Sequence, residues 1–313
     1  MSAAQVLGID FGGTKVALAT ADAGSPMVSS TPLRMPTTGG ADEVVRRSLE
    51  AARGLVAAPV AVGVSTIGVV RGDRIRLAPN VPGWEGIELP RMLRDEYGDT
   101  PVMIDNDVNA AAAAELRWGA LRGVDVGAYV NLGTGLAAAL VVGGRVVGGA
   151  HGAAGEIGYL LDPATDDCYA DGHAPLEELV SGSALASRGS ALVGRPVAAA
   201  ELFTMAGDPR VDALIDGALR RLAQAVANLC ITLDPERVAV GGGMMGAADR
   251  ILPRIAALLS RAVPFPPQLV PARFIDDAPL LGALALAAEA AASRRYVQPW
   301  PGPSGQPRSR PTS

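Results

Sequence analysis

The sequence predicts an α/β fold built from two related halves. Short apolar strands alternate with amphipathic helices along most of the 313 residues, a pattern typical of α/β proteins. The segment IDFGGTKVALA at 9–19 is echoed position by position by VNLGTGLAAAL at 130–140. This echo indicates that the same strand–turn–strand unit occurs once in each half. Two such halves would face each other across a cleft, where ligands commonly bind.

The composition describes a globular chain without attraction for nucleic acid. Hydrophobic residues make up 49%, charged residues 19%, and the formal net charge is −5, so the field of the whole protein does not attract nucleic acid. Aromatic residues account for only 4%, which argues against a base-stacking surface. Neither a signal peptide nor a membrane span is expected. The chain has two cysteines, Cys168 and Cys230, which fit a reducing cytoplasm rather than a disulfide framework.

The first half is expected to end in an alanine-rich helix. Its predicted elements are strands at 5–9, 16–21, 60–65 and 101–104 and helices at 42–56 and 107–118. Glycines form the turn between the first two strands. The helix at 107–118 is favoured because alanine is the best helix former, and Asp and Asn are preferred at its start.

The second half contains a longer helix and a final helix near the end of the chain. Its predicted elements are strands at 127–133, 137–142 and 237–243 and helices at 211–233 and 279–292. We predict a small N-terminal domain of residues 1–117 plus 279–292 and a larger domain of residues 118–278. Residues 293–313 are expected to form a disordered tail, because their Pro, Gly, Ser and Arg residues show no apolar periodicity.

Three glycine-rich turns are candidate phosphate-binding segments. Glycine at the tip of a turn leaves backbone N–H groups open to an anion, and a threonine hydroxyl adds a donor. The candidate residues are Gly12, Gly13, Thr14 and Lys15, then Gly133, Thr134 and Gly135, and finally Gly241, Gly242 and Gly243. Asp10, just before the first turn, is expected to orient a divalent cation. A single turn of this kind is usually only a tight hairpin, whereas three together indicate a nucleotide site.

An acidic segment at the start of the alanine-rich helix is the candidate catalytic site. MIDNDVN at 103–109 places Asp105, Asn106 and Asp107 between a strand and a helix. A helix cap explains one of these residues but not three. The helix dipole is expected to keep an aspartate ionised here. Such a carboxylate can accept the proton of a hydroxyl that attacks a phosphoryl group.

Further carboxylates follow in the second half. Glu156 lies among glycines and alanines, and Glu177 and Glu178 begin a helix. We expect one of the latter two to serve the helix end. Carboxylates and amides that line a cleft suit a polyhydroxylated substrate, whose hydroxyl groups they can bind.

From about residue 5 to residue 292 the sequence resembles the ROK family of sugar kinases and repressors, within the actin-like ATPase superfamily. The motifs are GIDFGGTKVALA, GVSTIGVV at 63–70, APNVPGW at 78–84, DNDVNAAAAAE, the glycine-rich run from NLGTG to GEIGY, and VAVGGG. The resemblance implies two actin-like (ribonuclease H-like) domains with an interdomain cleft. It implies ATP and Mg²⁺ as cofactors and glucose or a close relative as substrate, phosphorylated at a hydroxyl such as the 6-hydroxyl.

The resemblance also implies roles for individual residues. Asp107 corresponds to the catalytic base, and Asp10 to a residue that acts on Mg²⁺ indirectly. The implied substrate contacts are Gly68, Asn80, Asn106, Glu156, Tyr159 and Glu177.

The chain departs from the family at its structural zinc site. Tyr159 stands at the position of the family's histidine, Cys168 keeps the first cysteine, and Ala170 and Pro175 replace the other two. One ligand of four cannot hold tetrahedral zinc, so no zinc site is expected. Because the histidine also contacts the sugar in the family, the substrate stays open. An aminosugar such as kanosamine or a C7-cyclitol is the alternative to glucose.

Other classes of protein are less favoured. A sugar-sensing repressor needs a helix-turn-helix domain, and none fits before the first phosphate motif at residue 8. A sugar-binding protein without catalysis is disfavoured by Asp107. We expect a cytoplasmic homodimer, and polyphosphate stays an alternative to ATP as donor.

Overall fold

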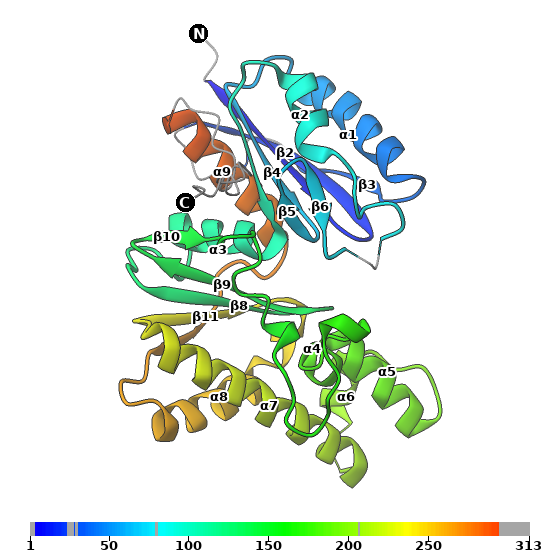
Figure 1. Ribbon diagram of the computed structural model, residues 1–313, viewed down its shortest axis with the longest axis vertical. Helices are drawn as coiled ribbons and strands as arrows, with labels where there is room; N and C mark the ends of the chain where they lie inside the picture. The colour runs from blue at the N-terminus through cyan, green and yellow to red at the C-terminus, as the bar shows by residue number, and fades with distance from the viewer. Residues whose placement is uncertain (1–3, 24–27, 29–30, 79–80, 206, 294–313) are drawn as a thin grey trace, which may run out of the picture.

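The computed structural model describes residues 4–293 except 24–27, 29–30, 79–80 and 206. Two five-stranded sheets form the centres of two lobes, with α3 (Asp107–Trp118) and α9 (Ala278–Ser293) between them (Figure 1). Apart from Ser293, the predicted disordered tail lies outside the described residues. Within the described part of the chain, no helix has both the length and the apolarity to cross a bilayer.

The first sheet has the strand order β3-β2-β1-β4-β7. Its strands are β1 (Gln5–Phe11), β2 (Lys15–Asp22), β3 (Leu33–Pro36), β4 (Ala61–Thr66) and β7 (Val102–Asn106). Helices α1 (Ala41–Leu55) and α2 (Leu89–Tyr97) share a hydrophobic core with one face of this sheet. Alternate strand residues face the other way and pack against α9, as expected from the two-residue period of a strand.

The second sheet has the order β10-β9-β8-β11-β12. Its strands are β8 (Gly127–Leu132), β9 (Leu136–Val142), β10 (Arg145–Val147), β11 (Arg237–Gly241) and β12 (Gln268–Pro271). The helices of this lobe are α4 (Glu177–Val180), α5 (Gly182–Val193), α6 (Ala199–Thr204), α7 (Pro209–Leu233) and α8 (Ala248–Ala262). Helices α7 and α8 share the core of one face, and α3 packs on the other.

The two sheets have the same topology, which confirms the predicted repeat. In each sheet the first hairpin is antiparallel, a third strand continues it antiparallel, and two parallel strands follow on the other side. Asp10 pairs with Ala17 in the first hairpin, and Asn131 pairs with Ala137 at the equivalent place in the second. The residues matched by the sequence echo therefore occupy matching positions in the fold.

Most of the predicted elements are present, but several were not predicted. Helix α3 has the predicted bounds, 107–118. The unpredicted elements include the edge strands β3, β10 and β12, the short hairpin of β5 (Val69–Arg71) and β6 (Arg74–Arg76), and helices α5, α6 and α8. Pro253 lies inside α8, where proline ordinarily breaks a helix, so its sequence does not suggest one long helix.

Helix α9 contacts its neighbours backbone to backbone. A Cβ atom on Gly63 of β4 would lie 1.8 Å from the carbonyl oxygen of Ala283 in α9. A Cβ atom on Gly282 of α9 would lie 2.0 Å from the carbonyl oxygen of Ala110 in α3. Both separations are too short for any side chain, so these positions require glycine. Through them α9 joins the first sheet to α3.

Helix α3 itself belongs by packing to both lobes. Ala110 is part of the core between α9 and the first sheet, whereas Val108 and Ala111 share a core with Tyr129 of the second sheet. The proposed division into residues 1–117 plus 279–292 and residues 118–278 places α9 with the first sheet. That division stays a prediction.

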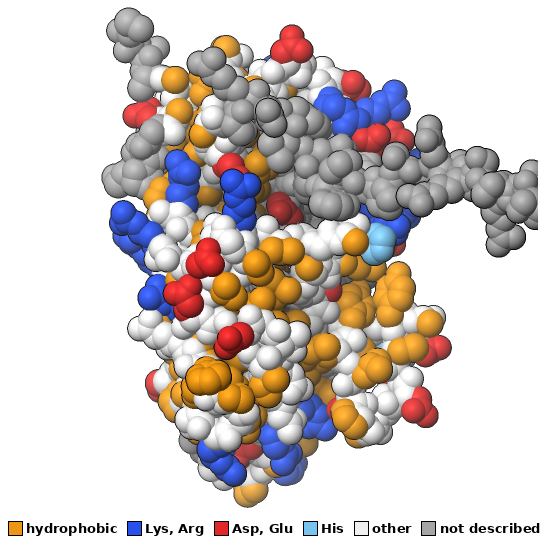
Figure 2. Space-filling model, turned by 60° about the vertical axis from the view of Figure 1, so that its left-hand side comes forward, with side chains coloured by type: hydrophobic (Ala, Val, Ile, Leu, Met, Phe, Trp, Pro, Cys, Tyr) orange, Lys and Arg blue, Asp and Glu red, His pale blue; other side chains and the backbone are white. Residues whose placement is uncertain are grey.

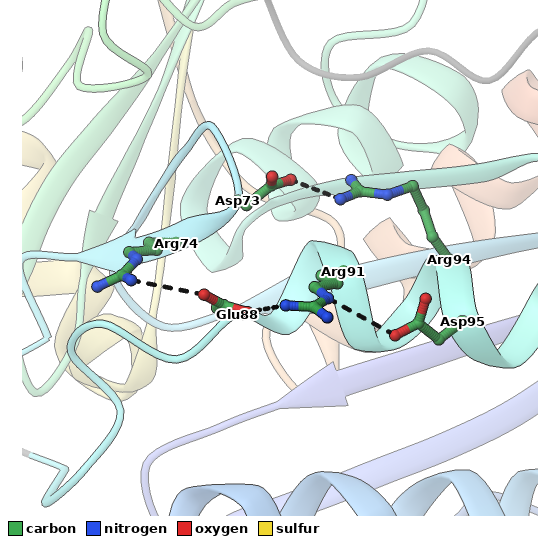
Figure 3. Close-up of polar contacts among 6 residues, drawn as sticks. All are labelled: Asp73, Arg74, Glu88, Arg91, Arg94 and Asp95. Atoms are coloured by element: carbon green, nitrogen blue, oxygen red, sulfur yellow. Dashed lines mark hydrogen bonds and ion pairs between the residues drawn. The ribbon is translucent and has the colours of Figure 1, made fainter.

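Ion pairs on the surface connect the β5–β6 hairpin to α2 (Figure 3). Asp73 with Arg94 at 2.7 Å and Arg74 with Glu88 at 3.5 Å join the two elements. Glu88 with Arg91 at 3.0 Å and Arg91 with Asp95 at 3.9 Å lie within α2 and its N-cap. Exposed pairs of this kind contribute only about 0–1 kcal/mol each. Their effect is mainly on the position of the hairpin, whose first strand follows Gly68.

The outer surface mixes charges of both signs. On the face shown in Figure 2, Lys and Arg side chains lie interspersed with Asp and Glu side chains. The described residues on this face therefore form no continuous positive strip for a polyanion.

The glycine contact of α9 gives a test of the fold. We expect Gly63→Ala to lower the free energy of unfolding by about 1–3 kcal/mol or more, because the added methyl group overpacks a rigid backbone contact. Gly217→Ala in α7 is the control, since its Cβ would meet only Arg221, at an ordinary 3.7 Å, and alanine favours a helix by about 0.5–1 kcal/mol. Denaturant unfolding of both variants measures the difference. Equal free energies of unfolding for Gly63→Ala and Gly217→Ala would contradict the close packing of α9 on β4.

Candidate active site

Acidic side chains from both lobes act on one another where the sheets meet. The charge of Asp107, the first residue of α3, raises the pKa of Asp10 at the end of β1. Burial raises the pKa of Glu156. The charges of Asp107 and of Glu177, at the start of α4, raise the pKa of Glu156 further. Asp107 is therefore near enough to Asp10 in one lobe and to Glu156 in the other for its charge to act on both.

Asp107 has a carboxyl group suited to accepting a proton. Burial raises its pKa to about 6, although the N–H of Val108 donates to Oδ1 at 3.0 Å and opposes the shift. The sequence argument considered only the helix dipole, which favours ionisation. Burial raises the pKa of Asp107 more than the helix dipole lowers it. With a pKa of about 6, the carboxyl group is still mostly ionised at neutral pH.

The other two polar residues of this segment have structural partners. Asn106 caps α3, since its Oδ1 accepts the N–H of Asn109 at 2.7 Å. Asp105 Oδ1 accepts the N–H of Asn106 and the Nδ2 of Asn109, both at 2.8 Å. The helix-cap interpretation therefore holds for Asn106. Its side-chain oxygen already accepts one hydrogen bond, whereas no partner among the described residues engages its amide nitrogen, so that nitrogen is the group best suited to reach a substrate.

Asp10 is a buried carboxyl group with an unused oxygen. Burial raises its pKa to about 7, although the Ser65 hydroxyl opposes the shift, and within the described residues its buried Oδ1 has no partner at hydrogen-bond geometry. Burying an unpaired polar atom is costly. A divalent cation, or water bound to one, is a partner of suitable chemistry, so this residue fits the predicted role toward Mg²⁺.

Two hydrogen bonds to the backbone of Gly12 hold the first glycine turn in place. The N–H of Gly12 donates to the carbonyl oxygen of Lys15 at 3.0 Å, and the Thr37 hydroxyl donates to the carbonyl oxygen of Gly12 at 2.8 Å. The amide of Gly12 is therefore not free for an anion. Among the described residues, no hydrogen bond uses the amides of Gly13 and Thr14, which remain as candidate phosphate donors.

Lys15 makes an ion pair that the sequence did not predict. Its Nζ lies 3.6 Å from Oδ1 of Asp277, the residue before α9, and Arg34 of β3 contacts the same carboxylate. The pair joins the first turn to the chain that returns from the second lobe. The position of Asp277 just before a predicted helix was the available signal, but it suggested no contact with Lys15.

The second glycine turn is tied to the helices that follow it. The N–H of Gly133 donates to the carbonyl oxygen of Gly135 at 3.1 Å, and the Ser183 hydroxyl donates to that of Thr134 at 2.7 Å. Glu177 Oε2 accepts the N–H of Leu136 at 2.7 Å. Glu177, predicted as a substrate contact, therefore also fixes the end of this turn.

A cavity of about 640 Å³ opens beside the second and third turns. Gly133, Thr134 and Gly243 line it together with Phe203 of α6 and Arg250 of α8. This volume is in the range of small-molecule sites. The sequence predicted the turns but missed the wall, because α6 is short and was not predicted.

The third turn leads from β11 into this cavity. Gly241 ends the strand and Gly242 has φ +94°, a conformation that favours glycine. A second cavity, of about 50 Å³, is lined by Gly242, Asn131 and Asp107. The third turn therefore lies close to the start of α3.

Two of the predicted substrate residues, Tyr159 and Glu177, lie close enough to Glu156 for their charges to interact. Burial raises the pKa of Glu156 to about 7. Burial also raises the pKa of Tyr159, and Glu156, Glu177 and Glu85 raise it further. Gly68 has φ +76° in the turn between β4 and β5, and Asn80 lies outside the described residues.

The segment that resembles the zinc loop makes contacts of other kinds. Cys168 Sγ donates to Asp171 Oδ2 at 3.1 Å, and His173 Nδ1 lies 3.1 Å from both carboxylate oxygens of Glu178. Glu178 also accepts the N–H of Ala174 at 3.0 Å, so it serves the start of α4 as predicted for one of the two glutamates. Across the described residues, no three His, Cys, Asp or Glu side chains gather so that they could hold a metal ion.

The repeated sheet with its two glycine hairpins defines an actin-like ATPase fold, which solved sugar kinases share. A ROK hexokinase from Thermus thermophilus is 33% identical, with a TM-score of 0.78 over 92% of this chain and 99% of the hexokinase. A ROK family glucokinase from Streptomyces griseus, solved with glucose and AMPPNP, is 27% identical, with a TM-score of 0.74 over 91% and 99%.

The chain belongs to the ROK family, whose sequence profile matches residues 6–290. The kanosamine kinase of Amycolatopsis mediterranei is 30% identical over 299 residues, or 91% of this chain and 97% of the relative. The N-acetylmannosamine kinase of Escherichia coli is 33% identical over 290 residues, or 90% and 97%. These similarities identify an ATP-dependent carbohydrate kinase.

The raised pKa of Glu156 predicts a pH-dependent stability of the ligand-free protein. The pKa rises from an ordinary 4.5 to about 7 on folding, so the folded state holds this proton more tightly than the unfolded state. Its contribution is present below about pH 4.5 and is lost as the pH rises to about 7. We expect Glu156→Gln to raise the free energy of unfolding at pH 8 by up to about 3 kcal/mol.

Glu178→Gln is the matched control. The N–H of Ala174 lowers the pKa of Glu178, so this charge stabilises the fold above its ordinary pKa and the change has the opposite sign. Denaturant unfolding between pH 5 and pH 8 distinguishes the two. A Glu156→Gln protein that is no more stable than wild type at pH 8 contradicts the unpaired burial of Glu156.

Proposed function

We propose that the protein transfers the γ-phosphoryl group of ATP to a hydroxyl of glucose or a close relative, the 6-hydroxyl, with Asp107 as general base. One observation carries the proposal. The charge of Asp107 acts on Asp10, beside the first glycine turn, and on Glu156, in the other lobe. A carboxylate between the phosphate turns and the substrate residues is where a base for phosphoryl transfer is needed.

The chemistry follows from the ionised state of Asp107. With a pKa of about 6, it is near the optimum for a base that works at neutral pH. It accepts the proton of the sugar hydroxyl as that oxygen bonds to the γ-phosphorus. The bond from phosphorus to the β–γ bridging oxygen breaks, and ADP leaves.

The phosphate side is assigned to the three glycine turns. The amides of Gly13 and Thr14 suit the phosphates, with the Thr14 hydroxyl and Lys15, and Thr134 and Gly135 face them from the second turn. The adenosine part fits the cavity of about 640 Å³ at Gly243, and the AMPPNP complex of the Streptomyces griseus glucokinase supports ATP as donor.

Asp10 is the residue that would hold hydrated Mg²⁺. The metal supplies charge neutralisation to the phosphates during transfer. Mg²⁺, the homodimer and the cytoplasmic location stay proposals.

The acceptor side is assigned to residues of both lobes. They are Gly68, Asn80, Asn106, Glu156, Tyr159 and Glu177. Carboxylates that accept from neighbouring hydroxyls suit a polyol. The support for this assignment is that, in addition to burial, the charge of Glu177 raises the pKa of both Glu156 and Tyr159, and the charge of Glu156 raises the pKa of Tyr159.

Asp107→Asn tests the base. The change keeps the size of the side chain but removes the proton acceptor, so we expect kcat to fall roughly 100-fold or more with the fold intact. Circular dichroism and thermal unfolding check the fold, and Asp95→Asn, at an exposed position of α2, is the control for the chemical change. Substantial turnover by a folded Asp107→Asn protein would overturn the assignment.

An aminosugar such as kanosamine is the second candidate substrate, and one observation favours it. Glu156 is buried near two other carboxylates, Asp107 and Glu177, and the one lysine of the chain, Lys15, is engaged with Asp277. A substrate ammonium group would neutralise this cluster. The similarity to a kanosamine kinase points the same way. A C7-cyclitol stays a further alternative.

A comparison of substrates decides between the two candidates. If Glu156 pairs with an ammonium group, we expect kcat/KM for kanosamine to exceed that for glucose by about tenfold or more, because a charged hydrogen bond in a buried site is worth about 1.5–3 kcal/mol. Glu156→Gln should then lower kcat/KM for kanosamine more than for glucose, and Asp95→Asn on the surface of α2 should change neither. Glucose as the better substrate, with equal losses for both sugars, would leave the glucokinase proposal in place.

A further inference from the structure

We propose that Tyr169 is a positioning residue that holds the ring of Tyr159 in the substrate site. The proposal rests on the proposed sugar kinase function and adds a determinant of sugar affinity. Tyr159 ends the 3-10 turn Ile157–Tyr159, and Tyr169 begins another, Tyr169–Asp171. Their ring centroids lie 5.5 Å apart with an interplanar angle of 85°.

This geometry is a favourable edge-to-face contact. Aromatic pairs prefer such an arrangement because the positive edge of one ring meets the negative face of the other. Among the described residues no hydrogen bond holds the Tyr159 hydroxyl, so packing must orient the ring. The contact with Tyr169 depends on how the two rings are oriented and not only on how much space the Tyr169 side chain fills.

The residue that is held in this way lies beside the carboxylates of the site. The N–H of Tyr159 donates to the carbonyl oxygen of Glu156 at 3.2 Å, and a Cβ atom on the neighbouring Gly158 would lie 3.4 Å from Oε2 of Glu177. Burial raises the pKa of Tyr159, and Glu156, Glu177 and, from the first lobe, Glu85 raise it further. Tyr159 therefore lies beside the proposed substrate residues. A neutral phenol there can donate one hydrogen bond and accept another.

The segment that carries Tyr169 is fixed at both ends. Near its start, Asp162 Oδ2 accepts from Nε of Arg221 in α7 at 3.0 Å. Near its end, His173 contacts Glu178 of α4. Tyr169 lies between these two points and is 64% exposed. Its contact with Tyr159 gives a reason for an aromatic side chain at this exposed position.

Steady-state kinetics test the proposal with a panel of two sugars, glucose and kanosamine, on the one that has the higher kcat/KM. We expect Tyr169→Leu to raise the KM for that sugar about two- to tenfold, the worth of an aromatic pair, while the KM for ATP is unchanged. Tyr169→Phe keeps the ring and should behave as wild type. Phe265→Leu is the control, since Phe265 is 77% exposed and follows α8.

A spectroscopic measurement judges the contact without turnover. The chain has 5 tyrosines, so uniform 3-fluorotyrosine labelling gives few fluorine resonances, and Tyr159→Phe identifies that of Tyr159. We expect this resonance to shift in Tyr169→Leu and to shift in wild type when the sugar is added. Phe265→Leu should leave it in place.

The outcomes separate the two proposals. A Tyr169→Leu protein with unchanged sugar KM overturns the positioning role, whether or not the resonance moves. Equal losses in Tyr169→Phe and Tyr169→Leu also overturn it, because the ring would then not be the feature that matters. If wild type phosphorylates no sugar in the panel but the Tyr159 resonance shifts in Tyr169→Leu, the aromatic contact stands and the sugar kinase function fails.

Discussion

The contact of α9 with β4 and α3 determines where the candidate catalytic groups lie. Two glycines let the backbone of α9 rest directly on the first sheet and on α3. The start of α9 then carries Asp277 to Lys15, and α3 carries Asp107 to the meeting point of the lobes. A bulkier helix at this place would separate groups that must act on one substrate.

The meeting point of the two lobes also buries carboxyl groups whose ionisation is unfavourable there. Burial raises the pKa values of Asp10, Asp107 and Glu156, so their ionised forms destabilise the ligand-free fold. A metal ion or a substrate ammonium group would offset that cost on binding. The raised pKa that would suit Asp107 to act as a base therefore costs stability, as is common at active sites.

Sequence reasoning succeeded where the pattern was local. The bounds of α3 follow from alanine and a polar cap, and the repeated hairpins follow from the echo around Asp10 and Asn131. It failed where a partner is distant in the chain or a pattern is interrupted. Asp277 is far from Lys15 in sequence, and Pro253 conceals α8. The cavity wall at Phe203 lies in a helix too short to show a period.

The single lysine gives the chain an unusual chemical handle. Apart from the α-amino group, an acylating reagent has one amine target in the whole sequence, and that amine is Lys15, whose side chain is 53% exposed. Amine coupling, which yields mixtures of labelled species in most proteins, therefore gives one side-chain product here. For the same reason, a surface that captures proteins through lysine side chains holds this one by its first glycine turn.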